Sequence, residues 1–232
     1  MIYQPNKPNL FAQLRTGHWS TNGLVGYYPF TRAGNLVDFS PNKNNGTITG
    51  PTWVGEGLLF RGWLQDDWVD CGVSPAGGQL ALTVEMIVRL DVITTHMIIA
   101  EDGTAYNTNS FYLISLDPGL LEFQIYAANY DSIKAAVAIV ANRDYHVVGT
   151  WRSGARTKLY VDGQDVGVTA AGTLQTAALW VGNTNLYIGG RPASPLDLPL
   201  SGMVRLFRIY NRALSASEIQ SLYINPNQLI YT

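Results

Sequence analysis

The sequence has one cysteine, few charged residues and no long apolar run. Cys71 has no second cysteine to pair with, so no disulfide can form within the chain, and we interpret it as a small core residue. Charged residues make up only 14% of the 232 residues and hydrophobic residues 47%, a balance that argues against intrinsic disorder. No apolar run approaches the roughly 18–20 residues of a membrane-spanning helix, so we expect no membrane partner.

Concentrated positive charge is also missing. The 15 basic and 17 acidic residues give a formal net charge of -2, and no lysine or arginine cluster stands out. We therefore expect no nucleic-acid partner, because such binding needs clustered cations to neutralise phosphates. The N-terminus has no basic segment followed by an apolar one, the pattern of a secretory signal, so we expect synthesis in a cytoplasm.

Catalytic motifs are scarce as well. The three histidines, His18, His96 and His146, lack metal-ligand spacing, and His146 is expected to be a core or edge residue. Neither a Gly-x-Ser-x-Gly nucleophile elbow nor a phosphate-binding loop is present. These absences predict that the chain is not an enzyme.

What the sequence does contain is a series of short apolar runs separated by Gly, Asn, Asp and Pro, which is typical of an all-β domain. In segment 84–90, four apolar residues alternate with Glu85 and Arg89, so we expect a strand with two different faces. Segments 111–116 and 121–126 flank an Asp-Pro-Gly turn and predict a hairpin. About a dozen such strands are too many for one open sheet and predict two packed layers.

One helix is predicted near the C-terminus. Ser215 and Glu218 have the spacing of a capping box, in which each side chain bonds to the backbone N–H of the other residue. Ile219, Leu222 and Tyr223 then share one face, and an Asn-Pro pair ends the helix. The helix is too short to be stable alone, so we expect it to pack on the sheets.

Several segments in a fixed order resemble one known family. In chain order they are GLVGYYPF (23–30), VDFSPNKNNG (37–46), GPTW (50–53), DWVDCG (67–72), YHVVGTW (145–151), LYVDG (159–163), LYIGG (186–190) and FRIYNRALS (207–215).

These segments resemble the laminin G-like, concanavalin A-like lectin/glucanase superfamily. The resemblance implies an all-β chain that folds as a two-layer antiparallel jelly-roll β-sandwich with one short C-terminal helix. We therefore divide the chain into an N-terminal arm (1–22), a laminin G-like sandwich domain (23–224) and a C-terminal tail (225–232). Because a fold does not fix a function, each site has to be argued from its residues.

Glucanases of this superfamily use carboxylates in a Glu-x-Asp-x-Glu arrangement on one strand, and this sequence lacks that spacing. Asp67 and Asp70 would lie on opposite faces of a strand and, together with Asp66, are expected to be solvated turn or strand-edge residues. The segment 101–103 (Glu-Asp-Gly) is expected to form a hairpin turn. The resemblance thus brings no catalytic pair with it.

Loops of this family commonly bind calcium and glycans. Asp38, Asn42 and Asn44 could supply three oxygens to a calcium ion, and backbone carbonyls could add more. The family often has an aspartate just after the Gly-x-Ile of its last strand, where this chain has Arg205, and that difference argues against calcium. The alternative is a loop whose Asx turns satisfy their own backbone, and both interpretations stay open.

The chain is rich in aromatic residues, with 6 Trp, 13 Tyr and 7 Phe. Sugars bind to aromatic rings through their apolar faces and to flanking amides through their hydroxyl groups. Most of these rings must be core or interface residues, but three loop segments combine rings with amides. The glycan-binding candidates in these segments are Tyr106, Asn107, Asn109, Tyr130, Trp180 and Asn183.

Both ends of the chain carry apolar residues although they lie outside the family-like segments. Free tails are usually polar, so these residues are expected to be buried somewhere. We predict that one or both ends form an interface with a second copy or another protein. The alternative is that they lie back across their own sheet. The interface candidates are Tyr3, Leu10, Phe11, Trp19, Leu229 and Tyr231.

These observations favour a non-catalytic binding or structural module. The first expectation is a virion structural or decoration protein of a capsid or tail surface, made in the host cytoplasm, because segment 222–229 resembles the ends of such domains in tailed-phage virion proteins. Its partners would be other virion proteins, further copies of the chain and glycans. The alternative is a carbohydrate-binding module of a bacterial secreted or cell-surface protein, and a glycoside hydrolase is a distant third.

Overall fold

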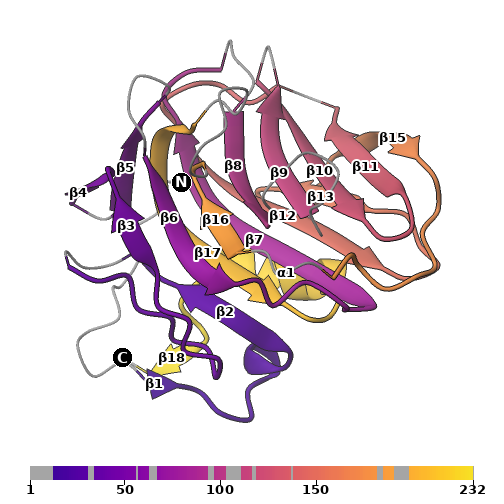
Figure 1. Ribbon diagram of the computed structural model, residues 1–232, viewed down its shortest axis with the longest axis horizontal. Coiled ribbons are helices and arrows are strands. Elements are labelled where there is room, and N and C mark those ends of the chain that lie inside the picture. Colours follow the sequence, from indigo (N-terminus) through magenta and orange to yellow (C-terminus); the bar gives the residue numbers. More distant parts are fainter. Residues whose placement is uncertain are drawn as a thin grey trace.

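The computed structural model describes residues 13–30, 34–55, 57–62, 67–93, 97–102, 111–116, 119–136, 138–181, 185–190 and 199–231. Its strands form two large sheets packed face to face, as Figure 1 shows. The front sheet has the strand order β15 (Gly167–Gly172), β11 (Tyr130–Ala135), β10 (Leu120–Tyr126), β9 (Phe111–Leu116), β8 (Met97–Asp102), β16 (Asn185–Ile188), β6 (Trp68–Val73) and β3 (Thr47–Thr49).

The back sheet contains the longest strands of the described chain. Its order is β14 (Gln164–Asp165), β13 (Lys158–Val161), β12 (Asp144–Arg152), β7 (Ala81–Leu90), β17 (Ser201–Tyr210), β5 (Gly57–Arg61) and β4 (Thr52–Val54), and β2 (Leu24–Tyr28) also pairs with β17. The pairings between these named strands are antiparallel, so the expected two-layer antiparallel sandwich is confirmed.

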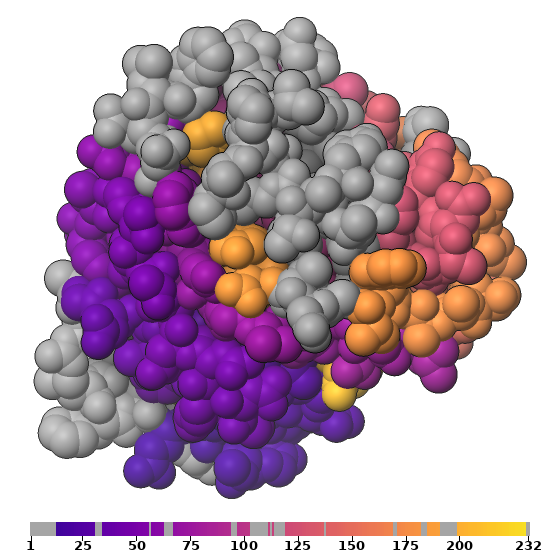
Figure 2. Space-filling view, viewed as in Figure 1, coloured from indigo at the N-terminus to yellow at the C-terminus, as the bar shows by residue number. Residues whose placement is uncertain are grey.

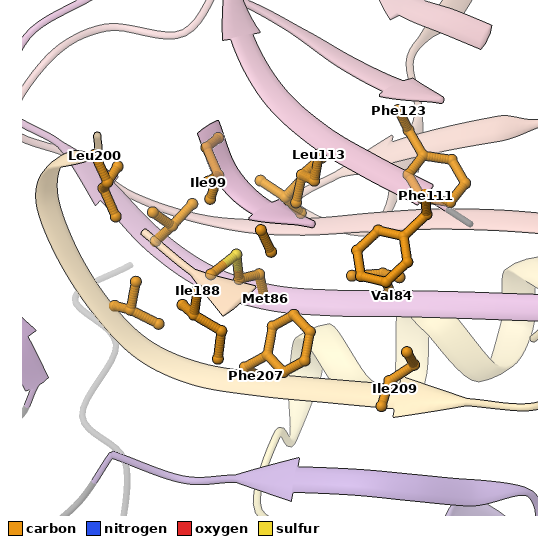
Figure 3. Packing of buried hydrophobic residues seen from close by; sticks show 14 of the residues in the cluster. Val84, Met86, Ile99, Phe111, Leu113, Phe123, Ile188, Leu200, Phe207 and Ile209 are labelled. Carbon is orange, nitrogen blue, oxygen red and sulfur yellow. The ribbon is translucent and has the colours of Figure 1, made fainter. Parts of the chain in front are cut away.

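The core fills the space between the two sheets. In β7 the alternate residues Val84 and Met86 are fully buried against the front sheet, whereas Glu85 points to the opposite face, as the alternation predicts. Figure 3 shows how side chains from both layers interdigitate. The labelled residues of this core are Val84, Met86, Ile99, Phe111, Leu113, Phe123, Ile188, Leu200, Phe207 and Ile209.

Two predicted turns have the geometry that their residues favour. The predicted hairpin forms between β9 and β10, with Leu116 opposite Leu120. The turn after β13 has Asp162 and Gly163 at φ values of 50° and 78°. This left-handed region is disfavoured for most residues but is open to Gly and tolerated by Asp, which explains the Asp-Gly pair.

A second apolar layer covers the outer face of the back sheet. Helix α1 (Ala216–Ile224) begins with the predicted capping box, in which the Glu218 N–H donates to Ser215 Oγ (3.3 Å) and the Ser215 N–H donates to Glu218 Oε2 (2.8 Å). Ile219 and Leu222 are fully buried against outward-facing residues of the sheet. No helix among the described residues is long and apolar enough to cross a membrane.

The described ends of the chain pack on the same outer face. Strand β1 (Gln13–Leu14) pairs with β18 (Ile230–Tyr231), and the Arg15 N–H donates to the carbonyl of Leu229 (2.8 Å). Leu229 is buried in the layer under α1, and Trp19, in the short 3-10 helix Trp19–Thr21, packs against it half-buried. The described ends therefore lie back on their own domain, which is the alternative to an interface with another chain. Tyr231 contributes its backbone to β18, and Tyr3, Leu10 and Phe11 lie outside the described residues.

A charged cluster lies buried under the helix layer. Arg208 of β17 pairs with Glu85 of β7 (Nη1–Oε1 2.9 Å), and its Nη2 donates to the carbonyl of Pro226 after the helix. His146 of β12, a buried residue as expected, contacts the same Glu85 oxygen through Nε2 (3.0 Å). The guanidinium also lies over the ring of Tyr27 at 4.6 Å. The cluster thus joins three central strands to the C-terminal segment.

Removing one member of this cluster should destabilise the folded domain. We expect Arg208→Ala to lower the free energy of unfolding by about 3–5 kcal/mol, because it leaves Glu85 buried without its partner. The control is Arg205→Ala on the same strand, whose pair with Asp144 is partly exposed, with an expected loss of less than about 1 kcal/mol. Urea denaturation of both variants checks this, and equal losses would contradict it.

The stability of the cluster should also depend on pH. Burial works to raise the pKa of Glu85, but the charge of Arg208 and the hydrogen bond from His146 outweigh it and hold the pKa below its ordinary value of 4.5. A carboxyl group with a lowered pKa contributes stability above its unfolded value and loses it as the pH falls through the folded value. The stability gap between wild type and Glu85→Gln should therefore shrink below about pH 4.5. Urea denaturation at a series of pH values measures the gap, and a constant gap would refute this.

Candidate functional site

The loop around Asp38 was the candidate calcium site. The buried carboxylate of Asp38 accepts hydrogen bonds from the N–H groups of Tyr27 (2.9 Å), Ser40 (2.8 Å) and Asn44 (2.9 Å). A fourth bond comes from the hydroxyl of Ser40 (2.8 Å). The carboxylate therefore holds the loop together by satisfying its backbone donors.

The asparagines of this loop contact their own chain as well. Asn42 Nδ2 donates to the carbonyl of Val25 (2.9 Å), and the carbonyl of Asn44 accepts from the hydroxyl of Tyr28 (2.6 Å). In the part of the chain that the structure describes, no group of three or more His, Cys, Asp or Glu residues could hold a metal ion. A calcium ion would have to displace bonds of the single carboxylate, so these donors fit the self-satisfied loop better than a metal centre.

Two aspartates near the start of β6 were expected to be solvated, but both accept hydrogen bonds from the protein itself. Asp67 is fully buried rather than solvated, and it accepts from the backbone N–H of Arg61 (2.7 Å) and from its guanidinium (2.6 and 3.0 Å). Asp70 is half-buried and accepts from Asn185 Nδ2 (2.9 Å) and from the Gly72 N–H (2.8 Å). The expectation of a solvated Asp67 was wrong because its partner Arg61 comes from β5, and no local pattern reveals that contact.

Glu101 and Asp102 do not form the expected hairpin turn. Strand β8 continues through both residues, and Glu101 pairs in register with Tyr187 of β16. Asp102 is buried and accepts from the Phe111 N–H (2.9 Å) and from the Ser74 hydroxyl (2.8 Å). The prediction failed because the acidic pair looks like a turn signal, whereas pairing with β16 and β9 keeps the segment extended. Gly103 lies outside the described residues.

The single cysteine lies in the core. Cys71 is fully buried in β6, and burial raises the pKa of its thiol well above the ordinary value. A thiol in this state is protonated and unreactive at neutral pH. This fits the interpretation of Cys71 as a small core residue.

Two of the predicted glycan-binding residues come together at one end of the front sheet. Tyr130 begins β11 and lies directly opposite Tyr126 at the end of β10, with ring centroids 6.0 Å apart. The Trp180 N–H donates to the carbonyl of Tyr126 (3.0 Å), which fixes the segment 173–181 beside this hairpin. We call Tyr126, Tyr130 and Trp180 the aromatic platform.

The aromatic platform is open to solvent. The exposed fractions are 48% for Trp180 and 38% for Tyr130, and Tyr126 is partly exposed. Leu179, the neighbour of Trp180, is buried in the core, so the chain turns one side chain inward and the next outward. Val181 beside it is 71% exposed. Exposed rings next to exposed apolar residues are unusual for a soluble domain and often mark a binding surface.

Amide groups hold and flank the aromatic platform. The Asn129 N–H donates to Gln175 Oε1 (2.9 Å), and the Tyr130 N–H donates to Asn129 Oδ1 (2.8 Å). Gln175 is itself buried and also donates to the carbonyl of Thr173 (2.8 Å). The tip of the hairpin is therefore fastened to segment 173–181, and the side chain of Asn129 lies exposed beside the rings.

Largely buried polar residues continue from the aromatic platform along the face of the front sheet that points away from the core. The next cross-strand pair is Gln124 with Ser132, and the one after it is Glu122 with Lys134, whose charged atoms are 3.8 Å apart. Figure 2 shows this face, with the orange segment 173–181 beside the rose-coloured strands β10 and β11. The arrangement places apolar rings next to amide, hydroxyl and charged groups.

Sequence reasoning missed Tyr126 as a member of the aromatic platform. It was placed in a strand and not in a loop, but alternation puts it on the face opposite to the core residue Ile125. That alternation, together with its position three residues before the candidate loop, is the signal that could have found it. Four other candidates, Tyr106, Asn107, Asn109 and Asn183, lie outside the described residues.

Comparison with known proteins places the fold in a family. The profile of a laminin G family, described as the concanavalin A-like lectin/glucanases superfamily, matches residues 65–220. The chain belongs to this superfamily. The match covers more than half of the chain and includes most strands of both sheets, while β2, β3, β4 and β5 lie on its N-terminal side. No curated protein sequence matches the chain.

Several solved structures have a similar fold over most of this chain's length. A Trypanosoma rangeli sialidase in complex with sialic acid has a TM-score of 0.66 at 20% identity, over 89% of this chain but only 33% of the sialidase. The binding domain of Paraclostridial Mosquitocidal Protein 1 has a TM-score of 0.68 at 16% identity, over 88% of this chain and 52% of that one. This chain thus spans a third to a half of the length of these two proteins. The similarity shows that they share its fold.

One similar structure is a separate domain of about the same size. Domain 4 of AbnA, a GH43 extracellular arabinanase from Geobacillus stearothermophilus, was solved in complex with arabinotriose. It has a TM-score of 0.64 at 20% identity, and the match covers 86% of this chain and 98% of that domain. A domain of this fold and length therefore occurs as one unit of a larger carbohydrate-active protein.

The Asp38 loop yields a test of its structural role. Replacing Asp38 with Ala leaves several backbone N–H groups without acceptors, so we expect a loss of at least about 2 kcal/mol in the free energy of unfolding. The melting temperature of the wild-type domain should be the same in millimolar calcium and in chelator. A melting temperature that rises with calcium, and no longer does so in Asp38→Ala, would instead establish a calcium site.

Proposed function

We propose that this domain is a non-catalytic carbohydrate-binding module whose ligand stacks on the aromatic platform. The observation that carries the proposal is that the ring pair of Tyr126 and Tyr130 lies at the strand end whose backbone is bonded to Trp180, an exposed ring of a separate segment. Rings brought together without being buried do not contribute to the core. Exposed rings of this kind can stack on the apolar face of a ligand.

Carbohydrate chemistry fits this surface. A sugar ring has a face of C–H groups that packs on an aromatic ring, and a rim of hydroxyl groups that needs hydrogen-bond partners. The rings of the platform supply the first requirement. Asn129, exposed at the hairpin tip, offers polar groups for the second.

The non-catalytic part of the proposal rests on how the carboxylates are used. Glycoside hydrolysis needs two carboxyl groups on either side of the scissile bond, about 5 to 9.5 Å apart, with one acting as an acid and the other as a nucleophile or base. Asp67, Asp70 and Asp102 each accept hydrogen bonds from their own chain, and Glu122 pairs with Lys134. These groups support the fold, and we assign them no part in turnover.

A virion is the place where we expect such a module. The expectation comes from the resemblance of segment 222–229 to the ends of virion domains, and the platform would then hold a glycan of the host surface. A bacterial secreted or cell-surface protein would use the same platform in the same way. Capsid, portal or tail genes beside the gene of this chain would support the first setting, and a gene for a secreted glycoside hydrolase would support the second.

A glycan array followed by calorimetry tests the proposed function. We expect binding of at least one oligosaccharide class by the wild-type domain, and a loss of about tenfold or more in affinity for Trp180→Ala and for Tyr130→Ala, equivalent to roughly 1.4 kcal/mol. The control is Val54→Ala on β4, an exposed apolar residue at the edge of the back sheet, which should bind like wild type.

Three results would overturn the proposal. The first is the absence of any glycan ligand for the wild-type domain. The second is binding that survives both aromatic substitutions in correctly folded protein, as judged by circular dichroism and melting temperature. The third is release of reducing sugar from a bound oligosaccharide, which would show turnover and contradict the non-catalytic assignment.

A further inference from the structure

The chain contains two Asn-Gly pairs, Asn22-Gly23 and Asn45-Gly46. This dipeptide can rearrange without an enzyme, because glycine has no Cβ and leaves its backbone nitrogen open to the asparagine side chain. The nitrogen attacks the amide carbon Cγ and closes a succinimide ring, and the side-chain nitrogen leaves as ammonia with the proton of the glycine N–H. Water then opens the ring to aspartate or to isoaspartate. Both pairs have the same chemistry, so their surroundings decide which one reacts.

The fold holds both reacting groups of the pair Asn45-Gly46. The Gly46 N–H donates to the carbonyl of Leu36 (2.8 Å), and Asn45 Oδ1 accepts from the N–H of Asp38 (3.0 Å). Gly46 is also buried, and a Cβ at its position would lie 2.8 Å from Val69 and 2.9 Å from Leu36. Attack on the side chain would therefore break two hydrogen bonds in a tightly packed place.

The pair Asn22-Gly23 is held much less firmly. Asn22 is exposed and ends the short 3-10 helix Trp19–Thr21. Among the residues that the structure describes, neither the side-chain amide of Asn22 nor the N–H of Gly23 has a hydrogen-bond partner. The Asn22 carbonyl accepts from Arg212 Nε (2.7 Å) in an exposed contact. Rotating this peptide toward the side chain gives up that exposed bond and leaves both reacting groups with no bond to break.

We propose that Asn22 is a site of spontaneous deamidation, whereas Asn45 in the same chain is protected by the fold. The product carries a new carboxylate next to Arg212, whose guanidinium already pairs with Glu218 (2.8 Å). Isoaspartate also adds one carbon atom to the main chain between the 3-10 helix and β2. Conversion therefore changes how the N-terminal segment joins the sandwich.

Peptide mapping of the full chain tests the proposed site. The folded protein is kept in mildly alkaline buffer, sampled over weeks, digested with trypsin and measured by mass spectrometry. Peptide 16–32 contains Asn22 as its sole asparagine, and fragmentation of peptide 44–61 separates Asn45 from its neighbour Asn44. We expect Asn22 to convert at least about tenfold faster than Asn45, because the bonds of Asn45 and Gly46 must open first.

Two further samples show whether the fold causes the difference. In urea both pairs lose their surroundings and should convert at similar rates. In Asp38→Ala the loop around Asn45 is loosened, so Asn45 should convert faster than in the wild type while Asn22 keeps its rate. Equal rates at the two sites in the folded wild type, or an Asn22 that converts in urea but not in the folded chain, overturn the proposal. An Asn45 rate that is the same in wild type and Asp38→Ala overturns the protection by the loop.

Discussion

The buried ion pair between Glu85 and Arg208 is the contact on which the back of the molecule depends. The two residues lie opposite each other on neighbouring strands, with His146 close to the same carboxylate on the next strand. A charge pair on a sheet face that is covered by an apolar helix has lost its water, and only good geometry offsets that cost. Here Oε1 of Glu85 contacts both Arg208 and His146, and the guanidinium also lies over a tyrosine ring and donates to the carbonyl of Pro226.

Through Pro226 this contact reaches the end of the chain. The segment after the helix continues to Leu229 and Ile230, which are buried in the second layer, and then into the short strand that pairs with β1. A polar contact in the middle of the sheet therefore also holds the segment that leads to the described ends. The apolar C-terminal tail, for which an interface with another chain was the first expectation, lies on its own domain.

Local patterns allowed much of the fold to be predicted. The alternation in β7, the hairpin of β9 with β10 and the capping box at Ser215 all depend on residues close in sequence, and all three are confirmed. Alternation also placed Glu85 on the face away from the main core. It could not show that a helix covers that face, because that cover comes from residues more than 120 positions further along the chain.

The candidate site shows the same limit more sharply. Tyr130 and Trp180 were recognisable as loop aromatics beside amides, but nothing local indicates that they meet. Their meeting depends on a backbone bond from residue 180 to residue 126, and Tyr126 was missed because a strand tyrosine resembles a core residue. Asp67 was misjudged for the related reason that its partner lies on another strand.

The place of β17 in the back sheet has a consequence for how the chain folds during synthesis. This strand lies between β5 and β7, although both of its neighbours are made more than 100 residues earlier. A growing chain thus leaves the ribosome with β5 and the long strand β7, whose facing edges have no partner until residues 201–210 emerge. Folding dominated by such distant pairing is slow, because long loops lose conformational entropy on closing before stabilising contacts form. The back sheet must therefore be one of the last parts of the domain to assemble. Until then, the unpaired strands of the nascent chain have to avoid aggregation.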